Sequence, residues 1–267
     1  MMRTLALLYH DVVPAGQYGV SGFQSPDANI YKLDCEEFES HLEHIGRTVE
    51  SAPSGSCEAR SAGNYRVLLA FDDGGVSASL YTADLLERFG WRGYFFVTTD
   101  WINAAGFLSE SQIVDLHRRG HVIGSHSCSH PLRMARCSRE QLDREWSTSV
   151  QRLTQILSSP VDTASVPGGY YSRDVAASAA RAGIRTLFTS EPVTSQHKVQ
   201  DCVVFGRFSV QQGVSADWVA ALAAGRVAPR ISRYAFWNAK KVIKTLGGEA
   251  WLRMRRTVLA NRSKSKP

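Results

Sequence analysis

The chain has 267 residues, of which 43% are hydrophobic and 21% are charged. This is the composition of an ordinary globular protein, so it argues against a disordered chain, and the length suits one large α/β domain. No run of about 18 apolar residues occurs, which argues against a membrane-spanning helix. The five cysteines follow no CxxC or disulfide-framework spacing, so we expect reduced thiols and a cytoplasmic location.

Positive charge is concentrated near the C-terminus. Residues 230–267 contain eleven Lys and Arg and one acid, a net charge of +10, so residues 1–229 carry −4 of the overall +6. We therefore predict a mildly acidic folded domain over residues 1–229. Residues 230–267 are predicted to form a basic helical extension.

Apolar runs of strand length alternate with helix-length amphipathic segments along the chain. Residues 5–9 form the first predicted strand, because this run is shorter than the apolar region of a signal peptide and has no small-residue cleavage site. Asp34 is a predicted helix N-cap, followed by apolar residues at i, i+4 and i+7 spacing. Residues 51–64 are rich in Ser, Gly and Ala and are predicted to be a surface loop.

The same alternation continues beyond residue 64. The predicted order is strand 67–71, helix 79–89, strand 94–97, helix 110–119, strand 121–124, a helix opened by a capping box at 138–141 and continuing to 157, strand 161–166, helix 173–182 and strand 184–189. Such alternation predicts a parallel sheet or barrel covered by helices. Function in these folds lies at the C-terminal ends of the strands, so polar residues there are the candidates.

Two adjacent carboxylates follow the second predicted strand. Asp72 and Asp73 lie on a glycine-rich turn directly after residues 67–71. Neighbouring carboxylates at a strand end are costly unless a cation or a shared proton relieves their repulsion. The alternative is an ordinary surface turn, so this pair needs support from a second motif.

Two histidines follow another predicted strand. If residues 126–130 make one helical turn, the rings of His126 and His130 lie on one side and can bind one metal ion. Two histidines at this spacing are weak evidence alone, but with Asp73 they make a three-ligand site that leaves room for water and substrate. Cys128 lies between the histidines at a spacing that points its thiol elsewhere, and we interpret it as a packing residue.

Both motifs resemble those of a known family. Residues 71–74 and 126–131 are similar to the first and second motifs of the polysaccharide deacetylases, the carbohydrate esterase family 4 or NodB-homology enzymes. These hydrolases remove N-acetyl groups from polymeric or lipid-linked amino sugars, and their fold is a distorted (β/α)7-type barrel with parallel strands. The resemblance implies roles for four residues: Asp72 as the catalytic base, and Asp73, His126 and His130 as the metal ligands.

A third segment departs from the family pattern. Pro167, Gly168, Gly169 and Tyr170 stand where the family has an Arg-Pro-Pro-Tyr-Gly motif, but the arginine is missing. In the family that arginine orients the base, so its absence leaves the activation of Asp72 unexplained. A backbone N–H near Gly169 or Tyr170 is a candidate oxyanion donor. The alternative is a simple Pro-Gly turn.

The family's general acid is a histidine at the end of a C-terminal strand, and no apolar run in that region ends in histidine. The first predicted strand, however, ends in Leu-Leu-Tyr-His-Asp at residues 7–11, which is similar to that motif displaced to the N-terminus, as in a circularly permuted member. We therefore predict that His10 protonates the leaving amine. The alternative is a structural histidine that caps the strand.

The resemblance also implies a cofactor and a substrate class. Two histidines and one aspartate suit a divalent metal, with zinc preferred and cobalt, nickel or iron also admitted. The expected substrate is an N-acetylated glycan, either a polysaccharide or a lipid-linked sugar. Two alternatives remain open, namely a carbohydrate-binding protein on a decayed deacetylase scaffold and a hydrolase of another linear amide.

The basic extension indicates where the protein acts. Residues 231–260 contain two predicted amphipathic helices that carry Lys, Arg and Trp. Such segments can lie on anionic membranes, so we predict peripheral contact with the inner face of the membrane. The alternative is that these helices cover the barrel. No stacking platform or nucleic-acid-binding module accompanies the charge, so no nucleic acid is expected.

Overall fold

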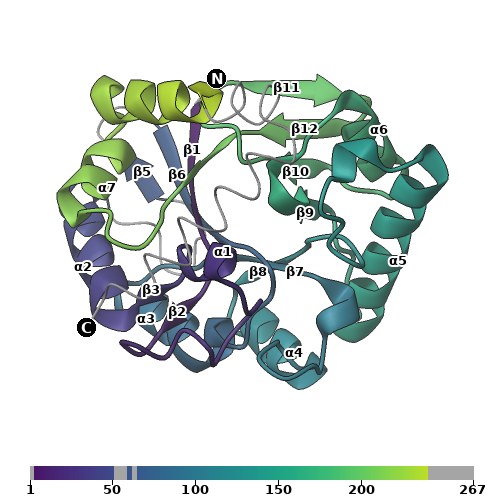
Figure 1. Cartoon of the computed structure of the whole chain (residues 1–267), viewed down its shortest axis with the longest axis horizontal. Coiled ribbons are helices and arrows are strands. Elements are labelled where there is room, and N and C mark those ends of the chain that lie inside the picture. Colours follow the sequence, from purple (N-terminus) through teal and green to yellow (C-terminus); the bar gives the residue numbers. More distant parts are fainter. Residues whose placement is uncertain (1–2, 51–58, 62–64, 240–267) are drawn as a thin grey trace.

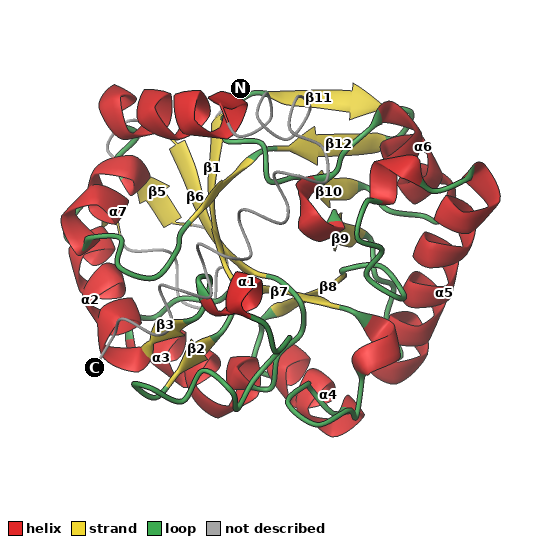
Figure 2. Ribbon diagram, in the orientation of Figure 1, coloured by secondary structure: helices red, strands yellow, loops and turns green. Residues whose placement is uncertain are grey.

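The computed structural model describes residues 3–50, 59–61 and 65–239. A curved sheet of mostly parallel strands forms the centre, and the larger helices lie around its outside (Figures 1 and 2). The parallel strands are β1 (Arg3–Tyr9), β6 (Tyr65–Phe71), β7 (Tyr94–Val97), β8 (Val122–Ser125), β9 (Thr163–Ser165), β10 (Thr186–Phe188), β12 (Cys202–Phe205) and β13 (Arg207–Ser209).

The parallel strands are hydrogen-bonded in the order β12-β10-β9-β8-β7-β6-β1-β13. Antiparallel strands extend this array at two places. β11 (Gln196–Val199) pairs with β12, and β5 (Ala59–Ser61) pairs with both β4 (Val49–Glu50) and β6. A separate parallel pair joins β2 (Val12–Val13) to β3 (Leu33–Asp34).

One short segment supplies both ends of the parallel array. β12 and β13 are separated only by Gly206, yet β12 pairs with β10 and β13 pairs with β1. The hydrogen-bonded ladder is therefore not closed, but the chain crosses from one edge to the other as a single segment. A Cβ atom at Gly206 would lie 2.3 Å from the carbonyl oxygen of Glu191, so this crossing requires glycine. The distorted (β/α)7-type barrel is thus confirmed.

The helices follow the predicted alternation closely. They are α1 (Pro26–Asn29), α2 (Cys35–Gly46), a π-helical turn (Ala78–Thr82) leading into α3 (Ala83–Arg88), α4 (Glu110–Arg118), α5 (Arg139–Leu157), α6 (Arg173–Arg181), α7 (Ala216–Ala223) and a last helix over 227–239. Single 3-10 turns occur at Thr99–Trp101, Met134–Arg136 and Pro167–Gly169. The predicted N-cap is confirmed, since the Asp34 carboxylate accepts the N–H of Glu37 at 2.7 Å.

The strands separate two layers of apolar side chains. Leu5, Leu7 and Tyr9 of β1 belong to the large cluster that also contains buried residues of α2, α4 and α7. Ala6, between them, belongs to a smaller cluster with residues of β6, β7 and β10. Successive side chains of a strand point to opposite faces, so the smaller cluster fills the barrel interior.

The structure differs from the sequence prediction at residues 59–61 and at the start of the first tail helix. Residues 59–61, predicted as loop, form β5, because antiparallel pairing with the next strand, β6, overrides a local composition typical of loops. The first predicted tail helix starts earlier than expected, at residue 227, so the predicted domain boundary at 229/230 falls inside it. The second tail helix lies outside the described residues, and the division into two parts stays a prediction. No helix in the described part of the chain is long and apolar enough to span a bilayer.

Candidate metal centre and active site

The predicted site residues follow strands that lie beside one another in the sheet. His10 follows β1, Asp72 and Asp73 follow β6, and His126 follows β8, which β7 alone separates from β6. Parallel strands present their C-terminal ends at the same edge, so these four side chains are brought to one place. The backbone N–H of Asp72 donates to the carbonyl of Tyr9 at 3.2 Å, which joins the β1 and β6 ends directly.

Two of these side chains, Asp73 and His126, form a cluster with His130 that has the donors of a metal site. One ligand atom from each of Asp73, His126 and His130 lies within 4.8 Å of the others. Asp73 Oδ1 lies 3.4 Å from His126 Nε2 and 3.5 Å from His130 Nε2. Tetrahedral ligands bound at about 2.1 Å are about 3.4 Å apart, so the three residues fit a divalent ion such as zinc.

The histidines converge through a loop and not through the predicted helical turn. β8 ends at Ser125, and residues 126–130 have no helical structure. Ser127 (φ 65°) and His130 (φ 60°) adopt left-handed backbone, as does Asp73 (φ 76°). Each such residue costs on the order of 1–3 kcal/mol and persists only where its surroundings impose it. Two of the three candidate ligands therefore sit on strained backbone.

Glu145 of α5 holds the histidine loop in this shape. Its Oε2 accepts the backbone N–H groups of Cys128 at 3.0 Å and Ser129 at 2.9 Å, and its Oε1 accepts the Ser129 hydroxyl at 2.6 Å. The sequence analysis missed this residue. In the sequence, Glu145 is recognisable as a carboxylate on the apolar side of the predicted helix, beside Leu142 and Trp146. The thiol of Cys128 contacts Asp100 and points away from the metal cluster, as predicted.

Ser165, at the end of β9, connects the metal cluster to the predicted base. Its hydroxyl lies 2.6 Å from His126 Nδ1 and its carbonyl lies 3.1 Å from the same atom, while the hydroxyl donates to Asp72 Oδ1 at 3.0 Å. With Nδ1–H donated to Ser165, His126 keeps its Nε2 lone pair for a metal. The serine therefore fixes the ring of His126 and one oxygen of Asp72 together.

Arg207, at the start of β13, supplies the arginine that the third motif lacks. Its Nη1 and Nη2 donate to Asp72 Oδ1 and Oδ2, each at 2.7 Å, and its Nε donates to the Thr189 carbonyl at 3.0 Å. Arg207 is fully buried, and its guanidinium lies 5.5 Å from the ring centre of Phe96 inside the barrel. Its sequence signal was one charged residue within an otherwise apolar strand segment over 202–210.

The electrostatics of Asp72 follow from this pair. Burial alone would raise the pKa of the Asp72 carboxyl, but the charge and hydrogen bonds of Arg207 outweigh burial and hold the pKa below its usual value. Asp72 is therefore ionised at neutral pH. An arginine thus reaches Asp72 from another strand, whereas the role of Asp72 as base stays a prediction.

His10 lies beside the Asp72 turn, because the residue before it accepts the N–H of Asp72, and its role as the acid stays a prediction. Its ring centre is 4.7 Å from that of Tyr31. Its Nδ1 is buried and has no hydrogen-bond partner among the described residues. A buried nitrogen without a hydrogen-bond partner is rare and requires an explanation. A strand cap would need a hydrogen bond, and Nδ1 makes none with the described residues.

The segment that replaces the third motif forms a tight turn near the histidine loop. Pro167–Gly169 make a 3-10 turn, and both Gly168 (φ 60°) and Gly169 (φ 71°) adopt left-handed backbone. The N–H groups of Gly169 and Tyr170 make long hydrogen bonds within the turn, at 3.4 and 3.5 Å. Their use as oxyanion donors stays a prediction.

An aromatic surface borders the metal cluster on one side. The ring centre of Phe23 lies 5.0 Å from that of His130 and 5.3 Å from that of Trp101. Phe107 packs against both Phe23 and Trp101. The side chain of Trp101 remains 40% exposed, so an apolar ring face is open beside the site.

A family model and a curated protein are similar to this chain in sequence. The family model described as "Polysaccharide deacetylase" matches residues 59–187. The Bacillus subtilis (strain 168) protein named "Putative polysaccharide deacetylase YxkH" is 22% identical over 195 residues, which cover 71% of this chain and 69% of that protein. The resemblance inferred from the two motifs is therefore confirmed.

Solved structures show the same fold. The Streptococcus pyogenes deacetylase PplD, in complex with acetate, aligns with a TM-score of 0.64 and 16% identity over 80% of this chain and 95% of that chain. IcaB from Ammonifex degensii aligns with a TM-score of 0.65 and 18% identity, over 84% of this chain and 98% of that one. At these identities the likeness concerns the fold alone.

Proposed function

We propose, from its resemblance to the polysaccharide deacetylases, that this protein is a metal-dependent hydrolase that removes N-acetyl groups from an amino sugar. One observation carries the proposal. The buried carboxylate of Asp72 accepts hydrogen bonds from Nη1 and Nη2 of Arg207. It lies beside the candidate metal ligands Asp73, His126 and His130. A base and a metal site in this relation are what hydrolysis of an unactivated amide requires.

The residues of the chain have separate parts in the reaction. A divalent ion bound at the three-residue cluster would polarise the acetyl carbonyl and acidify water. Asp72 Oδ1 accepts hydrogen bonds from Arg207 and Ser165, whereas Oδ2 accepts one from Arg207. Oδ2 therefore keeps a lone pair, and it is the oxygen that lies 3.9 Å from His126 Nε2, on the metal side. Oδ2 takes the water proton as general base.

Two further groups complete the mechanism. His10 donates a proton to the sugar nitrogen as the C–N bond breaks, and its buried, unpartnered Nδ1 supports this role. A backbone N–H at Gly169 or Tyr170 assists at the oxyanion once the turn opens toward substrate. The aromatic surface around Trp101 gives the apolar face of a sugar ring a place to pack.

The substrate is an N-acetylated polysaccharide or lipid-linked glycan, and the ion is zinc, with cobalt, nickel or iron as substitutes. The protein acts in the cytoplasm, in peripheral contact with the inner face of the membrane through residues 231–260. Within the part of that segment that the structure describes, Ile231, Tyr234 and Phe236 are exposed, as such contact requires.

Metal content measured together with acetate release tests the proposal. We expect about one divalent ion per chain, as for a single catalytic site with three protein ligands, and acetate release from members of a panel of N-acetylated glycans and glycolipids. Glycan binding without acetate release would favour the carbohydrate-binding alternative. Hydrolysis confined to non-sugar amides would favour the other alternative.

A further inference from the structure

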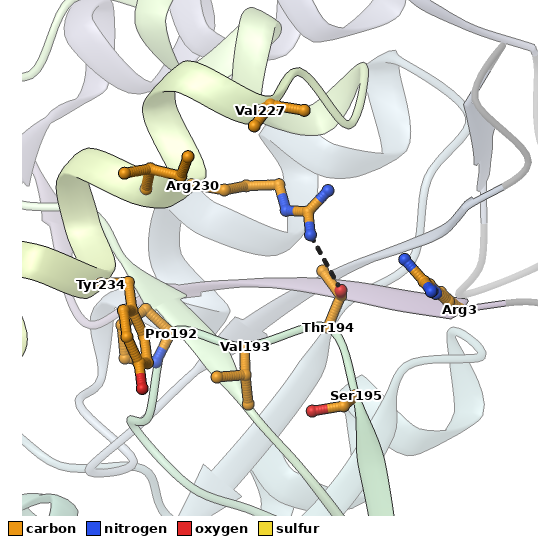
Figure 3. Close-up of a pocket in the computed structure, with 9 residues that line it drawn as sticks. Arg3, Pro192, Val193, Thr194, Ser195, Val227, Arg230 and Tyr234 are labelled. Carbon is orange, nitrogen blue, oxygen red and sulfur yellow. Dashed lines mark hydrogen bonds between the residues drawn. The ribbon is translucent and has the colours of Figure 1, made fainter.

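A second site lies at the other end of β1 from His10. A pocket of about 360 Å³ opens between Arg3, the segment 192–195 and the helix over 227–239 (Figure 3). Arg3 begins β1 and His10 follows its end, so the two lie about 20 Å apart along a strand of this length. The pocket is therefore separate from the candidate metal centre.

Arg230 is held in a fixed position at this pocket. Its Nη1 donates to the Tyr65 hydroxyl at 2.8 Å. Its Nη2 donates to Thr194 Oγ1 at 3.3 Å (Figure 3). The guanidinium also lies 5.5 Å from the centre of the Tyr65 ring. Because neutral partners hold it, Arg230 keeps its full charge and has N–H groups left for a ligand.

No negative charge balances these cations in the described part of the chain. None of the nine residues that line the pocket is acidic. No described carboxylate lies within 4.0 Å of Arg3 or Arg230, while the hydroxyls of Thr194, Ser195 and Tyr234 add neutral hydrogen-bonding groups. Two arginines with the Thr194 hydroxyl between them favour a ligand with several anionic oxygens, such as a phosphate group (Figure 3).

The helix beside the pocket exposes apolar side chains. Val227, Ile231 and Tyr234 follow one another at i, i+4 and i+7, so they share one side of the helix, and they are 62%, 61% and 47% exposed. All three also line the pocket. The sequence over 227–239 contains two arginines and no acid. A cationic helix with an exposed apolar stripe matches the surface of an anionic bilayer.

We propose that this pocket and stripe bind an anionic phospholipid bilayer. The phosphate of one lipid lies between Arg3 and Arg230, and Val227, Ile231 and Tyr234 enter the boundary between headgroups and acyl chains. The proposal names the surface through which the peripheral contact proposed above is made. It does not depend on the metal centre or on deacetylation.

Flotation of the full-length protein with vesicles tests this surface. The vesicles are phosphatidylcholine with or without phosphatidylglycerol, and the variants are Arg3→Gln, Ile231→Ser and the control Arg139→Gln, an exposed arginine at the start of α5. We expect binding only to vesicles with phosphatidylglycerol. Arg3→Gln should weaken it about fivefold, as expected for one surface cation, and Ile231→Ser should weaken it comparably. Arg139→Gln should change binding less than about twofold, since it lies outside the cationic surface.

Residues 240–267 add the same charge to every variant, so the differences report on the pocket. Equal flotation of Arg3→Gln, Ile231→Ser and wild type would overturn the proposal, as would an equal loss in Arg139→Gln. A calorimetric titration with glycerol 3-phosphate separates the two sources of phosphate. Binding of the soluble phosphate without binding to vesicles would reject the bilayer and leave a phosphate site. Acetate release from a soluble glycan without vesicles tests the deacetylase proposal separately.

Discussion

Asp72 and Asp73 are neighbours in the chain but have different surroundings. Asp72 is bound by Arg207 and Ser165, whereas Asp73 faces His126 and His130. Burial would raise the pKa of the Asp73 carboxyl, but the neighbouring imidazoles of His126 and His130 hold it well below its usual value. Both carboxylates are therefore ionised, and only Asp73 is directed at the imidazoles. Their different partners agree with the proposed roles, Asp72 as base and Asp73 as metal ligand.

Substitution of the two aspartates should separate metal binding from turnover. We expect Asp72→Asn to retain the metal and to lose at least about 100-fold in kcat, the contribution typical of a general base. Asp73→Ala and His126→Ala should lose both metal and activity, because each removes a ligand. Mass spectrometry of bound metal and an acetate assay measure the two effects. Full turnover in Asp72→Asn would reject its role as base.

Arg207→Lys tests how the base is kept ionised. Lysine preserves the positive charge but cannot donate to both oxygens in a fork, so the pKa of Asp72 should rise toward its usual value. Because Asp72 acts as the carboxylate, the acidic limb of kcat/KM should move to higher pH. Each unit of rise lowers the ionised fraction about tenfold below the pKa. Arg173→Lys, on the exposed start of α6, is the control, and an unmoved acidic limb in Arg207→Lys would contradict the role.

At the scale of elements, α5 shapes the loop that carries both histidines. Glu145 is on the buried side of α5 and accepts two backbone N–H groups of the loop. Within the loop, Ser127 Oγ accepts the N–H of His130 at 3.1 Å, and the contacts with Glu145 add to this bond where Ser127 and His130 adopt left-handed backbone. The helix therefore preorganises a ligand pair that it does not contain.

Removal of the Glu145 carboxylate should weaken metal binding. Glu145→Ala leaves the N–H groups of Cys128 and Ser129 without their acceptor, so the histidines lose their fixed orientation. We expect the metal affinity to fall by about 10- to 100-fold, as for other residues that orient ligands. Competition with a chromophoric chelator measures the affinity. Glu140→Ala, an exposed carboxylate on the first turn of α5, is the matched control. Equal affinities in both variants would count against this account.

At the scale of the whole molecule, the crossing at Gly206 assembles the site. The chain leaves one edge of the sheet as β12 and joins the other as β13, which places Arg207 inside the barrel. Arg207 and Asp72 are 135 positions apart in the chain, and their pair reaches across β1, which lies between β13 and β6. The orientation of the proposed base thus depends on the strand that the crossing at Gly206 brings to β1.

A metal bound by two separate strand ends should stabilise the whole fold. Asp73 follows β6 and His126 follows β8, so an ion links them only in the folded state. At a free metal concentration about 100-fold above Kd, linkage contributes about 2.7 kcal/mol. For a chain of this size that raises Tm by about 5–10 °C. Differential scanning fluorimetry with zinc and with a chelator measures the shift. Asp73→Ala should show none, and an unchanged wild-type Tm would reject the metal site.

The sequence by itself determined the order of strands and helices, the two carboxylates after β6 and the two histidines after β8. These features depend on local signals, because hydrophobic period, N-caps and short motifs are written within a few residues. The resemblance to a family then predicted the barrel and proposed His10 from a displaced motif.

The tertiary structure alone decided the partners of those residues. Arg207, Ser165 and Glu145 reach the site from β13, β9 and α5, and no local pattern states which distant side chain meets Asp72 or the histidine loop. The loop shape at 126–130 was predicted incorrectly because its left-handed backbone is imposed by contacts from outside the loop. Local sequence thus supplies the reacting groups, and long-range packing sets their orientation and charge.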